Sequence, residues 1–165
     1  MTITPDDLVE IEAIARLKHR YVRCLDQKRW DELAACFTDD ATSSYGGGDY
    51  SFTGREAILE FLRESLGSPQ MVTMHQVQQP EIDLAPDRAS AVGTWALEDR
   101  VIMVEHGLTL RGAAYYTDRY VKVDGEWKIK STGYKRTYEE LEPRAKDITL
   151  TAHIYDTGGR SSLNG

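Results

Sequence analysis

Tyr21 and Asp26 are the first residues of this chain that could do chemistry, because both lie near the end of a predicted amphipathic helix. Apolar side chains recur there at three- and four-residue spacing, at Ile14, Leu17, Tyr21, Cys24 and Leu25, whereas Lys18 falls off this stripe. The Tyr21 phenol is therefore expected inside the protein, where its hydroxyl needs a partner. Asp26 lies at the C-terminal end of the helix, where its charge opposes the helix dipole. A cap, a hydrogen bond in the turn or a catalytic partner could each offset that cost.

Three predicted helices and a brief strand must position these side chains. The first helix runs from Thr4 or Pro5 to Asp26, with Thr4 as its N-cap and acidic residues in its first turn. The other elements of this half are a short helix at residues 30–37, a strand at 41–45, an extended segment at 50–52 and a third helix at 55–66.

The hydrophobic period changes from 3.6 to 2 after residue 69, which predicts long strands at residues 71–84, 89–104, 108–123 and 126–138. In the second of these strands we expect Trp95 and Asp99 to point inward and Glu98 to point outward. Helices followed by an antiparallel meander make an α+β fold, in which a strongly bent sheet wraps the first helix as a cone. We assign residues 1–146 to this domain and residues 147–165 to a C-terminal tail.

The composition and charge of the chain exclude several classes of partner. Its 165 residues suit one domain, with 41% hydrophobic and 28% charged residues and a formal net charge of −7. The negative charge argues against nucleic acid and anionic membranes as partners. No apolar run approaches the roughly 20 residues that span a bilayer. The N-terminal segment lacks the pattern of a signal peptide, so we expect a cytoplasmic protein.

The run RYVRCLDQKRWDELAACFTDDA resembles the start of the SnoaL-like family of the nuclear transport factor 2-like superfamily. The sequences FTGREA at the third helix and DGEWKI in the last hairpin fit the same family, so the resemblance covers most of residues 5–138. It implies a cone-shaped α+β barrel with three N-terminal helices packed on a strongly curved, mostly antiparallel sheet. The chain looks most like the group of scytalone dehydratases, bile-acid 7α-dehydratases and hexachlorocyclohexane dehydrochlorinases.

The resemblance also implies a set of site residues. A catalytic pair would consist of Asp26 and of His75 on the strand after the third helix, with Tyr21 and Tyr45 as pocket tyrosines. An imidazole titrates near neutral pH, a carboxylate at its other ring nitrogen fixes its tautomer, and phenols can donate to a developing oxyanion. This chemistry suits the removal of water from a β-hydroxy carbonyl compound.

Three further residues complete the predicted pocket. Trp95 and Asp99 would contribute to substrate binding from the inward face of their strand, and Asp99 could also orient the histidine. Arg136, near the end of the last strand, could hold a substrate carboxylate or neutralise a carboxylate in the wall.

Every member of this set also has a purely structural interpretation. Asp26 suits a turn cap, His75 a hydrogen-bonded wall position, and the tyrosines a packed core. Asp99 and Arg136 suit a solvated sheet surface. We expect the remaining acids and bases to be solvated. Asp26, His75 and Asp99 could supply ligands to a divalent ion, but their spacing has no metal signature, and the lookalike enzymes need neither metal nor cofactor.

The sequence therefore predicts a cofactor-independent lyase, a dehydratase acting on a hydrophobic cyclic hydroxy-carbonyl substrate of polyketide or steroid type. A SnoaL-like cyclase or isomerase is one alternative, and a non-catalytic ligand-binding or dimerisation module is another. Apolar side chains on both faces of the long strands predict a homodimer or homotrimer. The apolar part of the tail, at residues 147–155, could cover the pocket mouth, a neighbouring subunit or a sheet edge.

Overall fold

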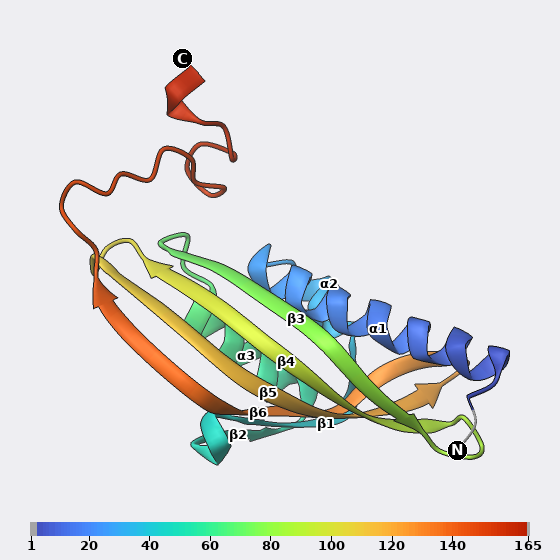
Figure 1. Ribbon diagram of the computed structural model, residues 1–165. Helices are drawn as coiled ribbons and strands as arrows, with labels where there is room; N and C mark the ends of the chain where they lie inside the picture. Colours follow the sequence, from blue (N-terminus) through green and yellow to red (C-terminus); the bar gives the residue numbers. More distant parts are fainter. Residues whose placement is uncertain (1–2, 165) are drawn as a thin grey trace.

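The order of the elements follows the predicted change from helix to strand (Figure 1). The structure is a computed structural model that describes residues 3–164. The helices are α1 (Pro5–Asp26), α2 (Trp30–Ala34) and α3 (Arg55–Leu66). The strands are β1 (Phe37–Tyr45), β2 (Tyr50–Thr53), β3 (Met71–Leu84), β4 (Ser90–Met103), β5 (Leu108–Val123) and β6 (Glu126–Pro143). Two short 3-10 helices lie at Gly46–Gly48 and Ser162–Asn164.

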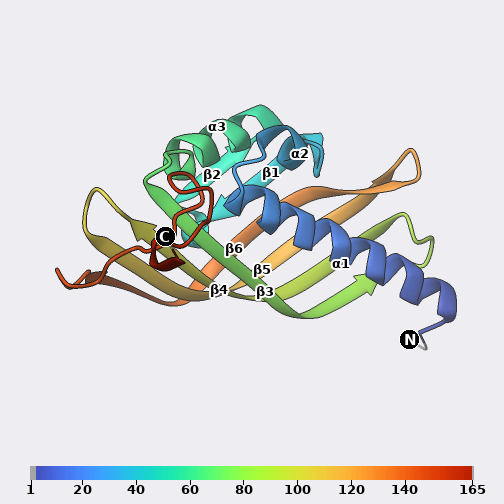
Figure 2. The same cartoon turned by 90° about the horizontal axis from the view of Figure 1, so that it is seen from above.

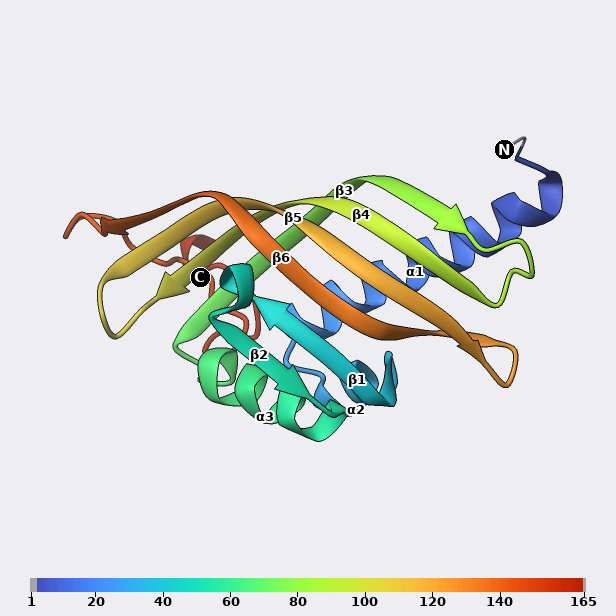
Figure 3. The same cartoon turned by 90° about the horizontal axis from the view of Figure 1, so that it is seen from below.

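The strands form one curled sheet in the order β2-β1-β6-β5-β4-β3. All neighbours are antiparallel except β1 and β6, which are parallel. Helix α1 lies along the concave face, and α2 and α3 close one end beside β1 and β2 (Figures 2 and 3). The predicted α+β fold with a strongly curved, mostly antiparallel sheet is confirmed. The sheet does not close into a barrel, because β2 and β3 remain at its two edges.

Helix α1 begins as predicted, at a capping box. The Thr4 hydroxyl accepts a hydrogen bond from the Asp7 backbone at 3.3 Å, and the Asp7 carboxylate accepts one from the Thr4 backbone at 2.8 Å. Pro5 occupies the first turn, where its missing N–H leaves no bond unmade. The helix is therefore fixed at its start, and its apolar stripe is buried against the sheet.

Two predicted element boundaries, the end of α2 and the end of β6, are wrong. Strand pairing that involves β6 overrides the local sequence pattern at both places. Helix α2 ends at Ala34 and β1 already begins at Phe37, since the Cys36 carbonyl accepts a 2.8 Å hydrogen bond from the Ile129 backbone in β6. Strand β6 continues past residue 138 to Pro143, which lies opposite Leu108 at the start of β5. Long-range hydrogen bonds to a neighbouring strand thus decide both ends.

The register of β4 is as predicted. Trp95 and Asp99 are buried, at 0% and 8% exposure, and Glu98 is exposed. A slip of one residue would have exchanged these two sets. The inward face of β4 is thus turned toward α1.

Lys18 corrects the expectation that the remaining charged residues are solvated. Its side chain is fully buried and lies 2.7 Å from the carboxylate of Asp118 in β5, which is also fully buried. The buried face of α1 is wider than its apolar stripe because the sheet curls around the helix (Figure 2).

In the described part of the chain, no helix is long and apolar enough to cross a membrane.

Candidate active site

The Asp26 carboxylate and the His75 ring are in direct contact. Asp26 Oδ1 lies 2.6 Å from His75 Nδ1. The other carboxylate oxygen accepts a 2.8 Å hydrogen bond from the backbone N–H of His75. The Thr73 hydroxyl donates to Oδ1 at 2.7 Å. The predicted proximity of Asp26 and His75 is therefore confirmed, and donors from β3 offset the unfavourable position of Asp26 at the end of α1.

The orientation of the imidazole follows from these bonds. A carboxylate only accepts hydrogen bonds, so a neutral His75 ring donates from Nδ1 and carries its lone pair on Nε2. The two side chains are only 8% and 13% exposed, so little solvent competes for the contact. Because His75 lines a cavity, Nε2 is the nitrogen left for a bound molecule.

The cavity has a volume of about 420 Å³ and lies between the end of α1, α3 and the concave side of the sheet. Its apolar wall includes Leu25, Leu62, Leu66, Val101, Met103 and Leu110. Its polar wall includes His75, five tyrosines and a group of charged residues from β4 and β6. This combination suits a largely apolar molecule with a few polar groups.

Tyrosine hydroxyls gather on one side of this cavity. The hydroxyls of Tyr21 and Tyr45 lie 3.3 Å apart, and Tyr116 and Tyr134 line the cavity beside them. Burial raises the pKa of Tyr21, Tyr45 and Tyr116 well above the usual value. These phenols are therefore neutral and can donate hydrogen bonds near neutral pH.

Tyr116 and Tyr134 line the cavity, but they were not predicted as site residues from the sequence. Tyr116 lies opposite Trp95 in the β4–β5 pairing and opposite Tyr134 in the β5–β6 pairing. Tyr116 could have been predicted from two features of the sequence. Trp95 was expected to point inward, and the tight turn between β4 and β5 pairs it with Tyr116, which puts both side chains on the same face of the sheet. Placing Tyr134 also required the irregular register between β5 and β6, which the sequence does not reveal.

Asp99 and Arg136 form a forked ion pair in the cavity wall. Both terminal nitrogens of Arg136 bond the Asp99 carboxylate, one of them at 3.0 Å, and its Nε lies 3.0 Å from Glu139. The guanidinium is thus shared between two carboxylates. Of the two predicted roles, this geometry fits the neutralisation of a wall carboxylate better than the capture of a substrate carboxylate.

Gly112 has no side chain, and the ion pair of Asp99 and Arg136 occupies the space that a side chain at this position would fill. A Cβ atom on residue 112 would lie 2.4 Å from Arg136 Nη1 and 3.0 Å from Asp99 Oδ1. We therefore expect Gly112→Ala to displace the guanidinium and lower turnover by about 10–10²-fold, a range typical of misplaced site groups. Steady-state kinetics beside Arg136→Met check this result. Wild-type kinetics in Gly112→Ala, with a clear defect in Arg136→Met, would contradict it.

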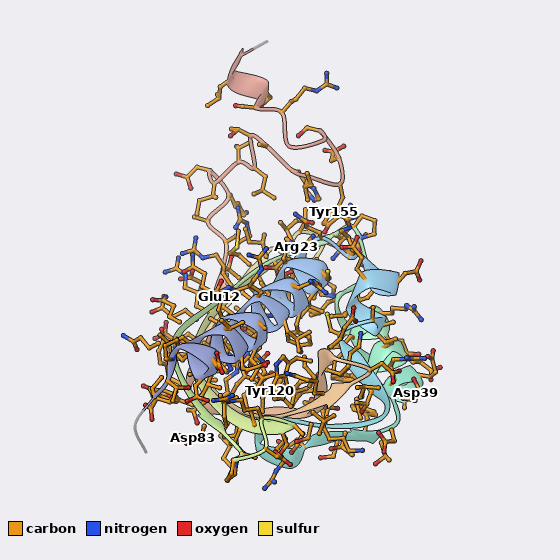
Figure 4. All side chains as sticks on the ribbon, turned by 90° about the vertical axis from the view of Figure 1, so that its right-hand side faces the viewer. Glu12, Arg23, Asp39, Asp83, Tyr120 and Tyr155 are labelled. Atoms are coloured by element: carbon orange, nitrogen blue, oxygen red, sulfur yellow. The ribbon has the colours of Figure 1, made fainter. Side chains whose placement is uncertain are left out.

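The structure does not bring Trp95 to the cavity. Its side chain is fully buried beneath α1, and its indole N–H donates to the Tyr120 hydroxyl at 3.0 Å. Figure 4 shows Tyr120 between α1 and the sheet. Of the seven predicted site residues, the other six line the cavity or, for Asp26, bond directly to a lining residue.

The C-terminal tail reaches the end of α1 that carries Asp26. The Tyr155 hydroxyl donates a hydrogen bond to the Asp26 backbone carbonyl, and Lys28 Nζ lies 4.7 Å from the centre of the Tyr155 ring. Figure 4 shows Tyr155 near the end of α1. This bond satisfies one of the carbonyls that a helix leaves unpaired at its end. Among the described residues, those of the tail do not line the cavity.

Truncation after Pro143 separates the two roles expected of the tail. If the tail acts as a lid, the shortened protein is folded, with impaired turnover or ligand binding. If it only covers apolar surface, the melting temperature falls and catalysis changes little. Thermal unfolding and steady-state kinetics on the same preparation distinguish these results, and no change in either quantity would contradict both roles.

Within residues 3–164, the side chains of His, Cys, Asp and Glu form no group of three or more that could hold a metal ion. Cys24 and Cys36 are buried free thiols.

Comparison with known proteins assigns the family. Residues 6–133 match the SnoaL-like domain. A probable cyclase of Gibberella zeae is 25% identical over 154 residues, which cover 86% of this chain and 98% of that protein. A putative scytalone dehydratase from Novosphingobium aromaticivorans DSM 12444 is 28% identical, with a TM-score of 0.77 over 92% of this chain and 95% of the other.

A further solved structure shares the fold. The hexachlorocyclohexane dehydrochlorinase LinA-type3 from Novosphingobium barchaimii LL02 is 21% identical, with a TM-score of 0.74 over 88% of this chain and 96% of the other. The TM-scores show that both solved structures have the same fold as this chain. The chain therefore belongs to the SnoaL-like family of the nuclear transport factor 2-like superfamily.

Proposed function

We propose that this protein is a cofactor-independent lyase, a dehydratase that acts by His75-mediated proton transfer. The observation that carries the proposal is the 2.6 Å contact between Asp26 and His75 at the edge of an apolar cavity. Relatives named as a cyclase, a putative scytalone dehydratase and a dehydrochlorinase support catalysis in this family.

The proposed reaction begins with proton removal by His75 Nε2 from the carbon α to a carbonyl group. Asp26 stabilises the imidazolium that forms, and the phenols donate to the enolate oxygen. The enolate then expels the β-hydroxyl as a carbon–carbon double bond forms. This hydroxyl takes the proton from the imidazolium and leaves as water, which returns His75 to its neutral form.

The proposed substrate is a hydrophobic cyclic hydroxy-carbonyl compound of polyketide or steroid type. The apolar wall favours ring carbons, and the neutral phenols favour hydroxyl and carbonyl oxygens. Arg136 is already bonded to two carboxylates, so we propose that the substrate carries no free carboxylate at this position.

A polyketide cyclase or isomerase is the second candidate, because the relative from Gibberella zeae is named a probable cyclase and matches along almost its whole length. The same proton abstraction would then lead to carbon–carbon bond formation. A non-catalytic ligand-binding or dimerisation module is the alternative outside catalysis, in which the Asp26–His75 contact would have only a structural role.

Incubation with mixed hydroxylated steroids and aromatic polyketides, read by mass spectrometry, tests the proposal. A dehydratase yields products lighter by one water, whereas a cyclase or isomerase yields products of unchanged mass with new retention times. His75→Ala serves as the control that should abolish either change. Ligand retention without any new product would favour the binding module.

We also propose that the protein is a homodimer or homotrimer joined through its sheet. Val92 and Tyr115 point away from α1 and are 40% and 57% exposed, so the outer face carries apolar side chains. Light scattering at micromolar concentration should give a multiple of the 18.7 kDa chain mass. A mass equal to one chain would contradict the proposed assembly.

A further inference from the structure

A second charged pair lies beneath the tyrosines of the cavity. Lys18 in α1 and Asp118 in β5 are 2.7 Å apart, and both side chains are fully buried. Neither residue lines the cavity, and neither contributes to the reaction proposed above. The pair is separate from the Asp26–His75 contact.

Asp118 has hydrogen-bond donors on several sides. The Tyr120 hydroxyl donates to it at 2.7 Å and the Thr132 hydroxyl at 2.6 Å, in addition to Lys18. The Trp95 indole in turn donates to the Tyr120 hydroxyl. Hydrogen bonds of this kind fix the position of a carboxylate.

Lys18 faces the cavity tyrosines on its other side. Its Nζ atom lies 3.4 Å from the ring centre of Tyr116 and 4.7 Å from that of Tyr21. Both rings line the cavity, so they stand between the ammonium and any bound molecule. The positive end of the ion pair therefore contacts two residues of the cavity wall.

Stability does not account for this arrangement. Apolar residues of similar volume are often as stabilising as a buried ion pair, or more so, because two charges lose their hydration. The Asp118 carboxylate also raises the pKa of Tyr21 and Tyr116, beyond the larger effect of burial. Without the cation, the carboxylate would thus oppose negative charge in the cavity.

We propose that Lys18 is a positioning residue whose ammonium, set against the faces of Tyr116 and Tyr21, makes their hydroxyls stronger hydrogen-bond donors to a negatively charged oxygen in the cavity. A cation against a ring face is stabilised by the π electrons and draws them toward itself. The remaining ring and its hydroxyl become more positive, which strengthens donation to an enolate or phenolate oxygen. The inference rests on the proposed function in one respect, namely that an enolate forms in the cavity.

The experiment compares two double variants of equal net charge. Lys18→Met/Asp118→Asn removes the buried pair. Glu10→Gln/Lys122→Met removes another pair between α1 and β5, whose charged atoms are also 2.7 Å apart but which lies partly exposed. The probes are 4-nitrophenolate, which carries a negative oxygen, and 4-nitroanisole, which does not. Calorimetry gives both affinities and requires no turnover, so this test can fail independently of the proposed lyase activity.

We expect Lys18→Met/Asp118→Asn to weaken 4-nitrophenolate binding about tenfold, in line with a desolvated cation–π contact, and 4-nitroanisole binding by less than about twofold. The Glu10→Gln/Lys122→Met protein should bind both probes like the wild type. Equal losses for both probes, no loss, or no binding of 4-nitrophenolate to the wild type would each overturn the proposal.

Tyr116→Phe provides a second route if the buried double variant does not fold. It removes one proposed donor and leaves the ion pair in place. We expect the same selective loss of 4-nitrophenolate affinity, with 4-nitroanisole affinity retained. Unchanged affinity for 4-nitrophenolate in Tyr116→Phe would show that this hydroxyl is not the donor and would overturn the assignment.

Discussion

Replacement of His75 by alanine is expected to lower turnover by about 10²–10⁴-fold, the usual contribution of a general acid–base group. In the proposed mechanism the imidazole is the proton-transfer group, and the 2.6 Å contact with Asp26 orients it. Asp26→Asn should lower the turnover number as well, because an amide cannot stabilise the imidazolium. Steady-state rates on any substrate found by mass spectrometry provide the measurement.

His106→Ala is the matched control, since His106 lies exposed in the turn between β4 and β5. It should retain wild-type turnover. Circular dichroism and thermal unfolding show whether each variant remains folded. A folded His75→Ala protein with wild-type turnover would refute the proposed mechanism and leave the cavity without a base.

Lys18→Met alone is expected to lower the free energy of unfolding by about 3–5 kcal/mol, the range seen when one partner of a buried ion pair is removed. Asp118 would remain fully buried without its counter-ion. Its hydrogen bonds from Tyr120 and Thr132 would persist, but they do not supply a positive charge. Urea unfolding of the variant and the wild type measures the loss.

A double-mutant cycle isolates the coupling within this pair. Lys18→Met/Asp118→Asn should recover most of the loss, because neither charge then remains buried. Lys122→Met is the matched control, and since Lys122 and Glu10 are partly exposed it should cost less than about 1 kcal/mol. Equal losses in Lys18→Met and Lys122→Met would show that Lys18 does not act as a buried counter-ion.

The long strands were predictable because alternation of apolar residues and the turn at Asp124-Gly125 are local signals. The bounds of β3 and β5, at Met71–Leu84 and Leu108–Val123, agree with the sequence. Asp26 was conspicuous for a similar reason, since its position at a helix end required a partner. The identity of that partner, His75, came from the family resemblance and not from any local pattern.

A strongly curved sheet was predicted, but its exact curvature was not predictable, and this curvature decides the rest of the site. It widens the buried face of α1 to include Lys18 and brings Tyr116 and Tyr134 from neighbouring strands into one cavity. It also leaves Trp95 beneath the helix and away from that cavity. These positions depend on strand register and twist summed over several strands, which no short stretch of sequence contains.

The bond from the His75 backbone N–H to Asp26 has a consequence for the border of the sheet. Strand β3 is an edge strand of the sheet, so the backbone groups on its outer side have no neighbouring strand to bond. At His75 a side chain from the end of a helix takes the place that another strand would occupy, which blocks pairing with a foreign chain at this point. We therefore expect the amide proton of His75 to exchange slowly with solvent only while the carboxylate is in place, so its exchange rate would report on the contact between Asp26 and His75.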